Sequence, residues 1–274
     1  KVRERIIYNL ENKCLSNGVL ENHIKYCIDH HVSGLDKIIE KYLKDKKIYN
    51  KDLLVDYILE NRDINYIKEN LLDKLDFETQ INFIDKIYEE NSSLIMDYIK
   101  KKCRYAKNEK KKSIYLYYLI KNKDIYGLNT FYKLLNKKMF YDDNQFSYNK
   151  SLSNALGMAD SIDCLDIVLK IYLLWYDEKF VSKGFHTLIQ GCRDAFVQMA
   201  LSDVSNGTNI AVITRLEEFI NTHSEIETIG FTNYTIDKIK LEHNLENHKE
   251  KNINEVINLV NKLFVKEKNI GLQY

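Results

Sequence analysis

The sequence predicts an all-α protein in which consecutive helix pairs stack as an α-solenoid. Hydrophobic residues recur at helical spacing along nearly the whole chain, as in Ile64, Ile67 and Leu71. The 274 residues contain no proline and nine glycines, so the usual breakers of helices are scarce. One local junction pattern also returns several times, which is typical of stacked repeats.

The expected elements follow this periodicity in order. Apolar residues fall on one helical face over 64–75 and again over 81–88. Two segments lack the pattern and are expected as irregular insertions, 141–150 and 226–236, the second because it combines β-branched residues with Gly230. The remaining chain is expected as one helical-repeat domain over 1–274.

The repeated junction consists of a helix end, a short polar turn, a capping residue and an aliphatic residue that opens the next helix. The capping residues, which can accept bonds from the first backbone N–H groups of a helix, are Asp63, Asp124, Ser161 and Thr208, with a weaker copy at Asn91. The opening residues are Ile64, Ile125, Ile162 and Ile210, and further aliphatics follow at Ile67, Leu128, Leu165 and Ile213. The junctions lie roughly 30 to 47 residues apart, the range of helix-pair repeats.

Two of these junctions resemble the boundary between consecutive HEAT repeats. The residues are Ala155–Leu169, which begin with Ala-Leu-Gly and continue through an Asp-containing turn, and Ser205–Ile213. The resemblance covers about 35–225 and implies an α-solenoid that binds partners on an extended surface. The proline common in the first HEAT helix is absent, so tetratricopeptide-like or irregular helical arrays stay open as alternatives.

Composition limits the classes of partner. The formal net charge is +1, from 41 basic and 40 acidic residues, so a charge-driven partner would need a local patch. The sequence lacks an uncharged apolar stretch of about 20 residues, which argues against a membrane partner. The five cysteines are scattered and form no CxxC pair, which indicates reduced thiols and a cytoplasmic location. The chain starts at Lys1 without Met, and we expect it to be a piece of a longer protein.

A basic cluster is the first candidate site. It comprises Lys100, Lys101, Lys102, Arg104, Lys107, Lys110, Lys111 and Lys112, with Tyr98, Tyr105 and Tyr115 interleaved. Lysines that neutralise phosphates and tyrosines that stack on bases would bind nucleic acid. The competing interpretation, which the sequence favours, is a solvated turn between two helices.

Two further groups of residues are candidate sites, one for metal binding and one for base excision. His23, Cys27 and His31 lie at helical spacing and offer the nitrogen and sulfur ligands that zinc accepts, but without a HExxH motif a half-buried polar seam is favoured. A group of DNA-alkylation glycosylases uses a HEAT-like fold, and the resemblance implies Trp175 and Asp177 as base-framing residues. Packing of Trp175 in the core is the favoured alternative.

The sequence shows no phosphate-cradling glycine loop and no nucleophile elbow, so we expect neither enzymatic activity nor a cofactor in this chain. We expect a scaffold or sensor module that binds another protein or another domain of its parent chain. The resemblance further implies the C-terminal sensor region of a bacterial STAND or NACHT-type ATPase, in which a separate domain hydrolyses ATP.

Overall fold

The computed structural model describes residues 2–12, 15–45, 51–136, 146–174, 185–203, 206–222 and 229–246. Across these residues the chain forms helices and turns and contains no strand, so the all-α prediction is confirmed. The chain divides into two compact units, Lys1–Tyr98 and Ile99–Tyr274, and the division falls within one helix. The expectation of a single repeat domain stays a prediction.

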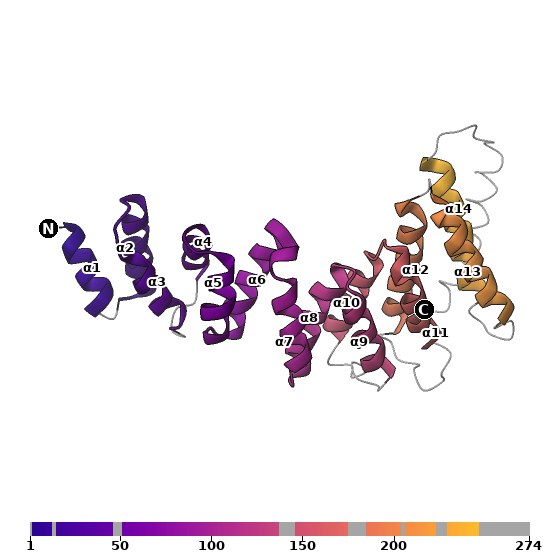
Figure 1. Cartoon of the computed structure of the whole chain (residues 1–274), viewed down its shortest axis with the longest axis horizontal. Coiled ribbons are helices and arrows are strands. Elements are labelled where there is room, and N and C mark those ends of the chain that lie inside the picture. Colours follow the sequence, from indigo (N-terminus) through magenta and orange to yellow (C-terminus); the bar gives the residue numbers. More distant parts are fainter. Residues whose placement is uncertain are drawn as a thin grey trace. The chain divides into compact units, whose positions relative to one another are not determined.

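Among the described residues, the first unit consists of short helices (Figure 1). The helices are α1 (Val2–Asn12), α2 (Asn17–Asp29), α3 (Leu35–Leu43), α4 (Asp52–Asn61), α5 (Ile64–Tyr66), α6 (Phe77–Asn91) and the beginning of α7 (Met96–Tyr105). A π-helical turn, Ile67–Leu71, and a 3₁₀ turn, Leu72–Lys74, follow α5 directly, and a second 3₁₀ turn, Ser92–Leu94, follows α6.

The core of the first unit follows the predicted periodicity. Ile67, Leu71 and Leu72 are fully buried, as the apolar face over 64–75 predicted. In α6, Phe83 and Ile87 are buried at a spacing of four residues, which places them on one face of that helix.

In the described parts of the chain, the second unit continues α7 and adds seven helices. They are α8 (Glu109–Lys121), α9 (Ile125–Asn136), α10 (Phe146–Gly157), α11 (Leu165–Leu173), α12 (Phe185–Ser202), α13 (Thr208–Thr222) and α14 (Ile229–Glu246). A 3₁₀ turn, Ile162–Cys164, leads directly into α11.

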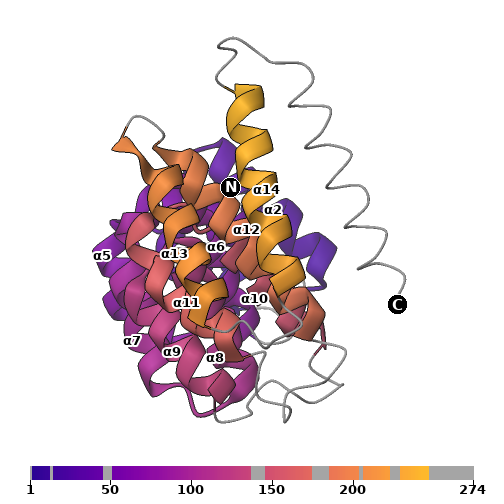
Figure 2. The ribbon, with the colours of Figure 1, turned by 90° about the vertical axis from the view of Figure 1, so that its right-hand side faces the viewer.

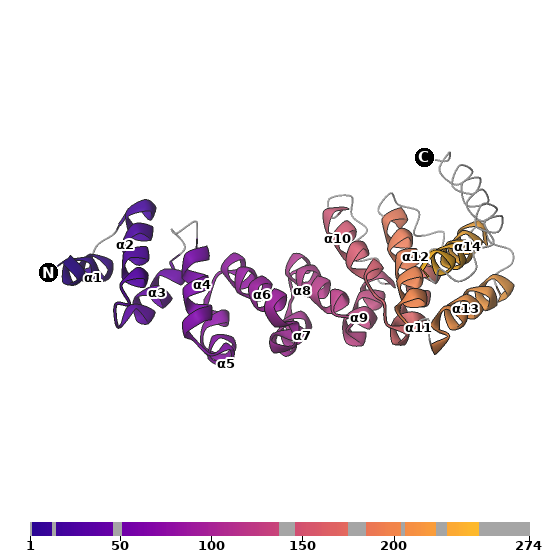
Figure 3. The ribbon, with the colours of Figure 1, turned by 90° about the horizontal axis from the view of Figure 1, so that it is seen from above.

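The helices of the second unit lie in two rows, one with α8, α10, α12 and α14, the other with α9, α11 and α13 (Figures 2 and 3). Within the first row α10 packs against both α8 and α12. A Cβ atom added at Gly191 of α12 would lie 2.4 Å from the carbonyl oxygen of Ser153, so this glycine permits the close approach of α10 and α12.

Three of the five predicted capping residues are confirmed at the level of hydrogen bonds. Asp63 accepts a bond from the amide of Asn65 at 2.8 Å, Asp124 from Gly127 at 2.9 Å and Asn91 from Ser93 at 3.1 Å. Ser161 occupies the predicted N-cap position, but its hydroxyl makes no capping bond. Thr208 is the first residue of α13 rather than its cap, because Gly207 makes the preceding turn with φ +71°.

Both segments expected as irregular insertions are helical where the structure describes them. Helix α10 begins at Phe146, so the expectation for 141–150 is wrong over its second half. Helix α14 begins at Ile229, although Gly230 and several β-branched residues suggested a loop over 226–236. Thr232 and Thr235 of α14 are buried, so tertiary packing outweighs their low helix propensity. The other residues of both segments lie outside the described ranges.

Candidate functional site

The basic cluster is spread over two helices and the link between them. Lys100, Lys101, Lys102 and Arg104 belong to α7, Lys107 lies in the link, and Lys110, Lys111 and Lys112 occupy the first turn of α8. Positive side chains suit the C-terminal end of α7 but oppose the dipole at the N-terminal end of α8. Asn108 caps α8 by accepting a bond from the amide of Lys111 at 3.0 Å.

Two members of the cluster hold α9 in place. The Lys100 ammonium lies 3.0 Å from a carboxylate oxygen of Asp124, the residue that caps α9. The Lys100 ammonium and the Arg104 guanidinium also lie over the ring of Tyr126, 5.3 and 5.6 Å from its centroid. These two cations therefore have structural partners, whereas Lys101, Lys107 and Lys110 are exposed to solvent.

The interleaved tyrosines do not form a stacking platform. Tyr98 and Tyr115 are 8% and 4% exposed and belong to the core, whereas Tyr105 is 69% exposed. The Tyr98 hydroxyl donates a hydrogen bond to Asp73. Of the three tyrosines, only Tyr105 has a ring that is exposed enough to stack on a base. The other two cannot take the stacking role that the nucleic-acid hypothesis gave them.

The zinc candidates do not come together. His23 and Cys27 lie on α2, where Cys27 is fully buried, but the helix ends at Asp29. His31 follows the helix end with a left-handed backbone (φ 49°), which removes it from the face that unbroken helical spacing predicted. In the described parts of the chain no group of three His, Cys, Asp or Glu side chains is arranged to hold a metal ion. Trp175 and Asp177 lie outside the described residues.

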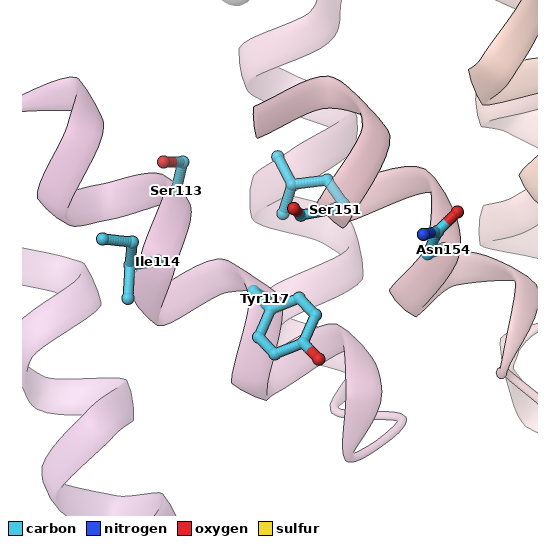
Figure 4. Close-up of a pocket in the computed structure, with 6 residues that line it drawn as sticks. Ser113, Ile114, Tyr117, Ser151 and Asn154 are labelled. Atoms are coloured by element: carbon cyan, nitrogen blue, oxygen red, sulfur yellow. The ribbon is translucent and has the colours of Figure 1, made fainter. Parts of the chain in front are cut away.

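A pocket between α8 and α10 is the site that the sequence did not reveal. We call it the α8–α10 pocket; it has a volume of about 320 Å³ and is lined by Ser113, Ile114, Tyr117, Ser151, Leu152 and Asn154 (Figure 4). This volume lies at the lower end of the range for small-ligand sites and would hold roughly ten water molecules. Hydroxyl, amide and aliphatic groups thus share one opening.

The polar groups of this pocket differ in their bonding. The Ser113 hydroxyl is buried and donates to the carbonyl of Lys110 at 2.8 Å. The Tyr117 hydroxyl and the Asn154 amide make no hydrogen bond to another described residue. Each can donate and accept, so a ligand in the pocket would find hydrogen-bonding partners on both helices.

Charge is distributed unevenly around the pocket. Residues 113–120 of α8 and 151–157 of α10 contain no ionisable carboxylate or cation. On α8, Lys110, Ile114, Tyr117 and Lys121 follow at spacings of four, three and four residues and share one face. The Lys121 ammonium lies 5.7 Å from the centroid of the Tyr117 ring, and along this face of α8 one lysine precedes Ile114 and one follows Tyr117.

The groups with shifted pKa values lie away from this pocket. Burial raises the pKa of the Cys103 and Cys164 thiols to about 11. In the first unit, burial and a hydrogen bond to Asp36 raise the pKa of Tyr57 to about 12. None of these side chains lines the α8–α10 pocket, so its chemistry rests on hydrogen bonding and on nearby lysines.

The sequence contained one indication of this pocket, the helical spacing of Lys110, Ile114, Tyr117 and Lys121 on α8. Tyr117 is expected as a packing aromatic from its spacing, and it does pack edge-on against Tyr118 with ring centroids 5.4 Å apart. Its partner surface is on α10, part of which was expected as a loop. Recognition of the pocket therefore required the pairing of α8 with α10.

Among the described helices, none is both long enough and apolar enough to cross a membrane. Compared with known proteins, the chain matches no family model, no curated protein and no solved structure. The packed helices are compatible with a helical repeat.

Proposed function

We propose that this chain is a non-catalytic binding module that holds a segment of another protein, or of another domain of its parent chain, in the α8–α10 pocket. The observation that carries this proposal is the pocket itself, which combines the aliphatic side chains Ile114 and Leu152 with the open polar groups of Tyr117 and Asn154. Such a mixture suits a peptide, whose backbone needs hydrogen bonds and whose side chains need apolar contact.

Exposed aliphatic side chains at the helix junctions support a protein partner. Ile125 and Ile162 are 40% and 39% exposed, and Met158, four positions before Ile162 in the sequence, is exposed as well. The two turns that carry them are neighbours, because Lys123 forms an ion pair with Asp160 and the Cys164 thiol lies 3.7 Å from the carbonyl oxygen of Lys123. A further apolar surface on the same unit favours protein over nucleic acid as a partner.

The same proposal includes the architecture and the parent protein. The two rows of the second unit would continue as an α-solenoid of HEAT-like pairs, which offers an extended binding surface. The parent would be a bacterial signalling ATPase of the STAND or NACHT type, with this region as its sensor. This step rests on the resemblance at Ala155–Leu169 and Ser205–Ile213, and it is an analogy of fold.

Capture from a lysate of the source organism tests the proposal. Three forms of the chain are immobilised: wild type, the pocket variant Asn154→Arg, and the control Gln198→Arg, which changes an exposed residue of α12 outside the pocket. We expect discrete proteins on wild type and Gln198→Arg after nuclease treatment, and their loss on Asn154→Arg. Equal capture by all three forms would contradict a role for the pocket. Helical circular dichroism establishes that each variant folds.

Nucleic-acid binding by the basic cluster is the second candidate function. The exposed side chains of Lys101, Lys107, Lys110 and Tyr105 favour it. It predicts nucleic acid on the resin before nuclease treatment, binding that falls steeply with salt, and loss of that binding when Lys101 and Lys107 are changed to Glu.

A further inference from the structure

We infer that the α8–α10 pocket captures one carboxamide side chain, a glutamine or asparagine of the bound segment, an inference that rests on the proposed function of the pocket. The first reason is the bonding capacity of its two open polar groups. The Asn154 amide offers donors and an acceptor from α10, and the Tyr117 hydroxyl offers both from α8 (Figure 4). A carboxamide has the same mixture, two N–H donors and a carbonyl oxygen with two lone pairs, so it can bond to Asn154 and to Tyr117 together.

The geometry of amide pairing favours a side chain over a peptide backbone. In a side-chain carboxamide one N–H lies on the same side as the C=O, so two such groups can exchange two hydrogen bonds. The N–H and C=O of one trans peptide group point in opposite directions, so a backbone needs two successive peptide groups to make the same pair. Asn154 is exposed, so a single glutamine or asparagine of a partner can reach its amide.

The second reason is that a charged side chain finds no dedicated counter-ion in the pocket. The residues described in its lining include no Asp, Glu, Lys, Arg or His. Lys121 lies over the Tyr117 ring and has a further interaction partner, and Lys110 is exposed, where an ion pair contributes little. Asp194, whose Cβ lies 3.1 Å from the position of a Cβ added at Gly157, already accepts a hydrogen bond within α12. A carboxylate or ammonium that enters therefore loses water without gaining a paired charge, whereas a neutral amide exchanges one set of hydrogen bonds for another.

The third reason is the size of the pocket. One turn of an α-helix, about 10 Å across and 5.4 Å long, occupies about 420 Å³, whereas the pocket holds about 320 Å³. A helix therefore does not fit inside, but one side chain with its neighbouring peptide groups does. The aliphatic part of that side chain meets Ile114 and Leu152, and glutamine, with one methylene more than asparagine, gains more of this apolar contact.

An array of random octapeptides with uncharged ends tests the inference on the full chain. We expect the bound peptides to share Gln or Asn at one position. The strongest of them is then compared by fluorescence polarisation with two twins of similar side-chain size, Glu and Met in place of Gln, or Asp and Leu in place of Asn. We expect each twin to bind on the order of tenfold more weakly, because the acid cannot donate and the apolar residue leaves the polar groups of the pocket unpaired.

Variants of nearly unchanged shape locate the effect. Tyr117→Phe removes the hydroxyl, and Asn154→Asp replaces the N–H donors by an acceptor, so each should weaken binding of the carboxamide peptide on the order of tenfold. Asn154→Asp should also strengthen binding of a twin with Lys at the selected position, because the new carboxylate supplies a counter-ion, and misfolding cannot produce such a gain. Tyr105→Phe and Asn221→Asp make the same two changes at exposed positions outside the pocket and should bind like wild type.

Three outcomes would overturn the inference. The first is an array in which no peptide binds, or in which the bound peptides share neither Gln nor Asn. The second is equal affinity for the carboxamide peptide and its twins. The third is unchanged affinity in both Tyr117→Phe and Asn154→Asp, which would place the peptide elsewhere on the chain. Lysate capture judges the binding module separately, because loss of captured proteins on Asn154→Arg together with any of these outcomes would keep the pocket as a protein site without a carboxamide ligand.

Discussion

Lys51 is buried with 7% of its surface exposed, although lysine is among the residues least often found inside proteins. Its ammonium donates to the carbonyl of Leu43 at 2.8 Å and lies 2.7 Å from a carboxylate oxygen of Asp76. Asp76 also caps α6 by accepting bonds from the amide and hydroxyl of Thr79. This pair therefore joins the end of α3 to the start of α6, and loss of either partner would leave the other charge buried.

The Asp76 carboxyl makes stability depend on pH. Burial by itself raises its pKa, but hydrogen bonds from Lys51 and Thr79 outweigh burial and lower the pKa from 3.8 to about 2. Because the unfolded chain binds the proton more readily, the contribution is complete above about pH 4 and is lost as pH falls toward 2. The shift corresponds to about 2 kcal/mol at neutral pH.

Urea unfolding of wild type and Asp76→Asn measures this contribution. At pH 6 we expect Asp76→Asn to be less stable by about 2 kcal/mol, and by pH 3 about half of that difference should be gone. Asp97→Asn, which changes an exposed carboxylate of α7, should differ little from wild type at either pH. A difference between wild type and Asp76→Asn that stays constant from pH 6 to pH 3 would contradict the assignment.

At the scale of single helices, the junction before α9 separates two aliphatic residues by environment. The residue that opens the helix is partly exposed in α9, where Ile125 is at the first position. The aliphatic three positions later, Leu128, is fully buried. Since three residues correspond to nearly one helical turn, the two side chains share a face, but the first projects beyond the packed interface. The buried position is therefore the one that stabilises the fold.

Alanine substitution in α9 distinguishes the two positions. Leu128→Ala should lower the free energy of unfolding by roughly 2 to 5 kcal/mol, because it removes buried volume. Ile125→Ala should cost less than about 1 kcal/mol, because much of its side chain is already in solvent. Thermal unfolding followed by circular dichroism compares them. Equal losses would mean that the exposed edge is covered in solution.

At the scale of the whole molecule, buried cysteines lie in both compact units, so their reactivity measures how well each unit is packed. Cys27 lies in the first unit, and Cys103, Cys164 and Cys192 lie in the second; all four are buried and free. Burial raises the pKa of each of these thiols, so little reactive thiolate forms near neutral pH.

Maleimide labelling followed by peptide mass spectrometry tests this protection. We expect all four thiols to stay unlabelled in the native chain at pH 7.5 and to be labelled fully in concentrated guanidinium chloride. Tyr105→Phe, a change at an exposed position of α7, should leave the pattern unchanged. Rapid labelling of Cys192 in the native chain would show that the packing of α12 opens in solution.

Local patterns predicted the helices and several of their junctions because both depend on neighbouring residues. Helical periodicity and the capping side chains of Asp63 and Asp124 act within a few positions along the chain, and the hydrogen bonds confirm them. The same local view failed at Thr232 and Thr235. Their helix in α14 depends on burial in the packed second unit, which no neighbouring residue specifies.

The sequence by itself thus determined that the chain is helical, where helices such as α9 begin, and which of their residues are apolar. Tertiary structure alone decided that Tyr117 of α8 and Asn154 of α10 line one pocket, and that His31 leaves the face of His23. The physical reason is the separation along the sequence over which each kind of interaction acts. Backbone hydrogen bonds and caps connect residues a few positions apart, whereas the pocket joins side chains nearly forty residues apart through the packing of two helices.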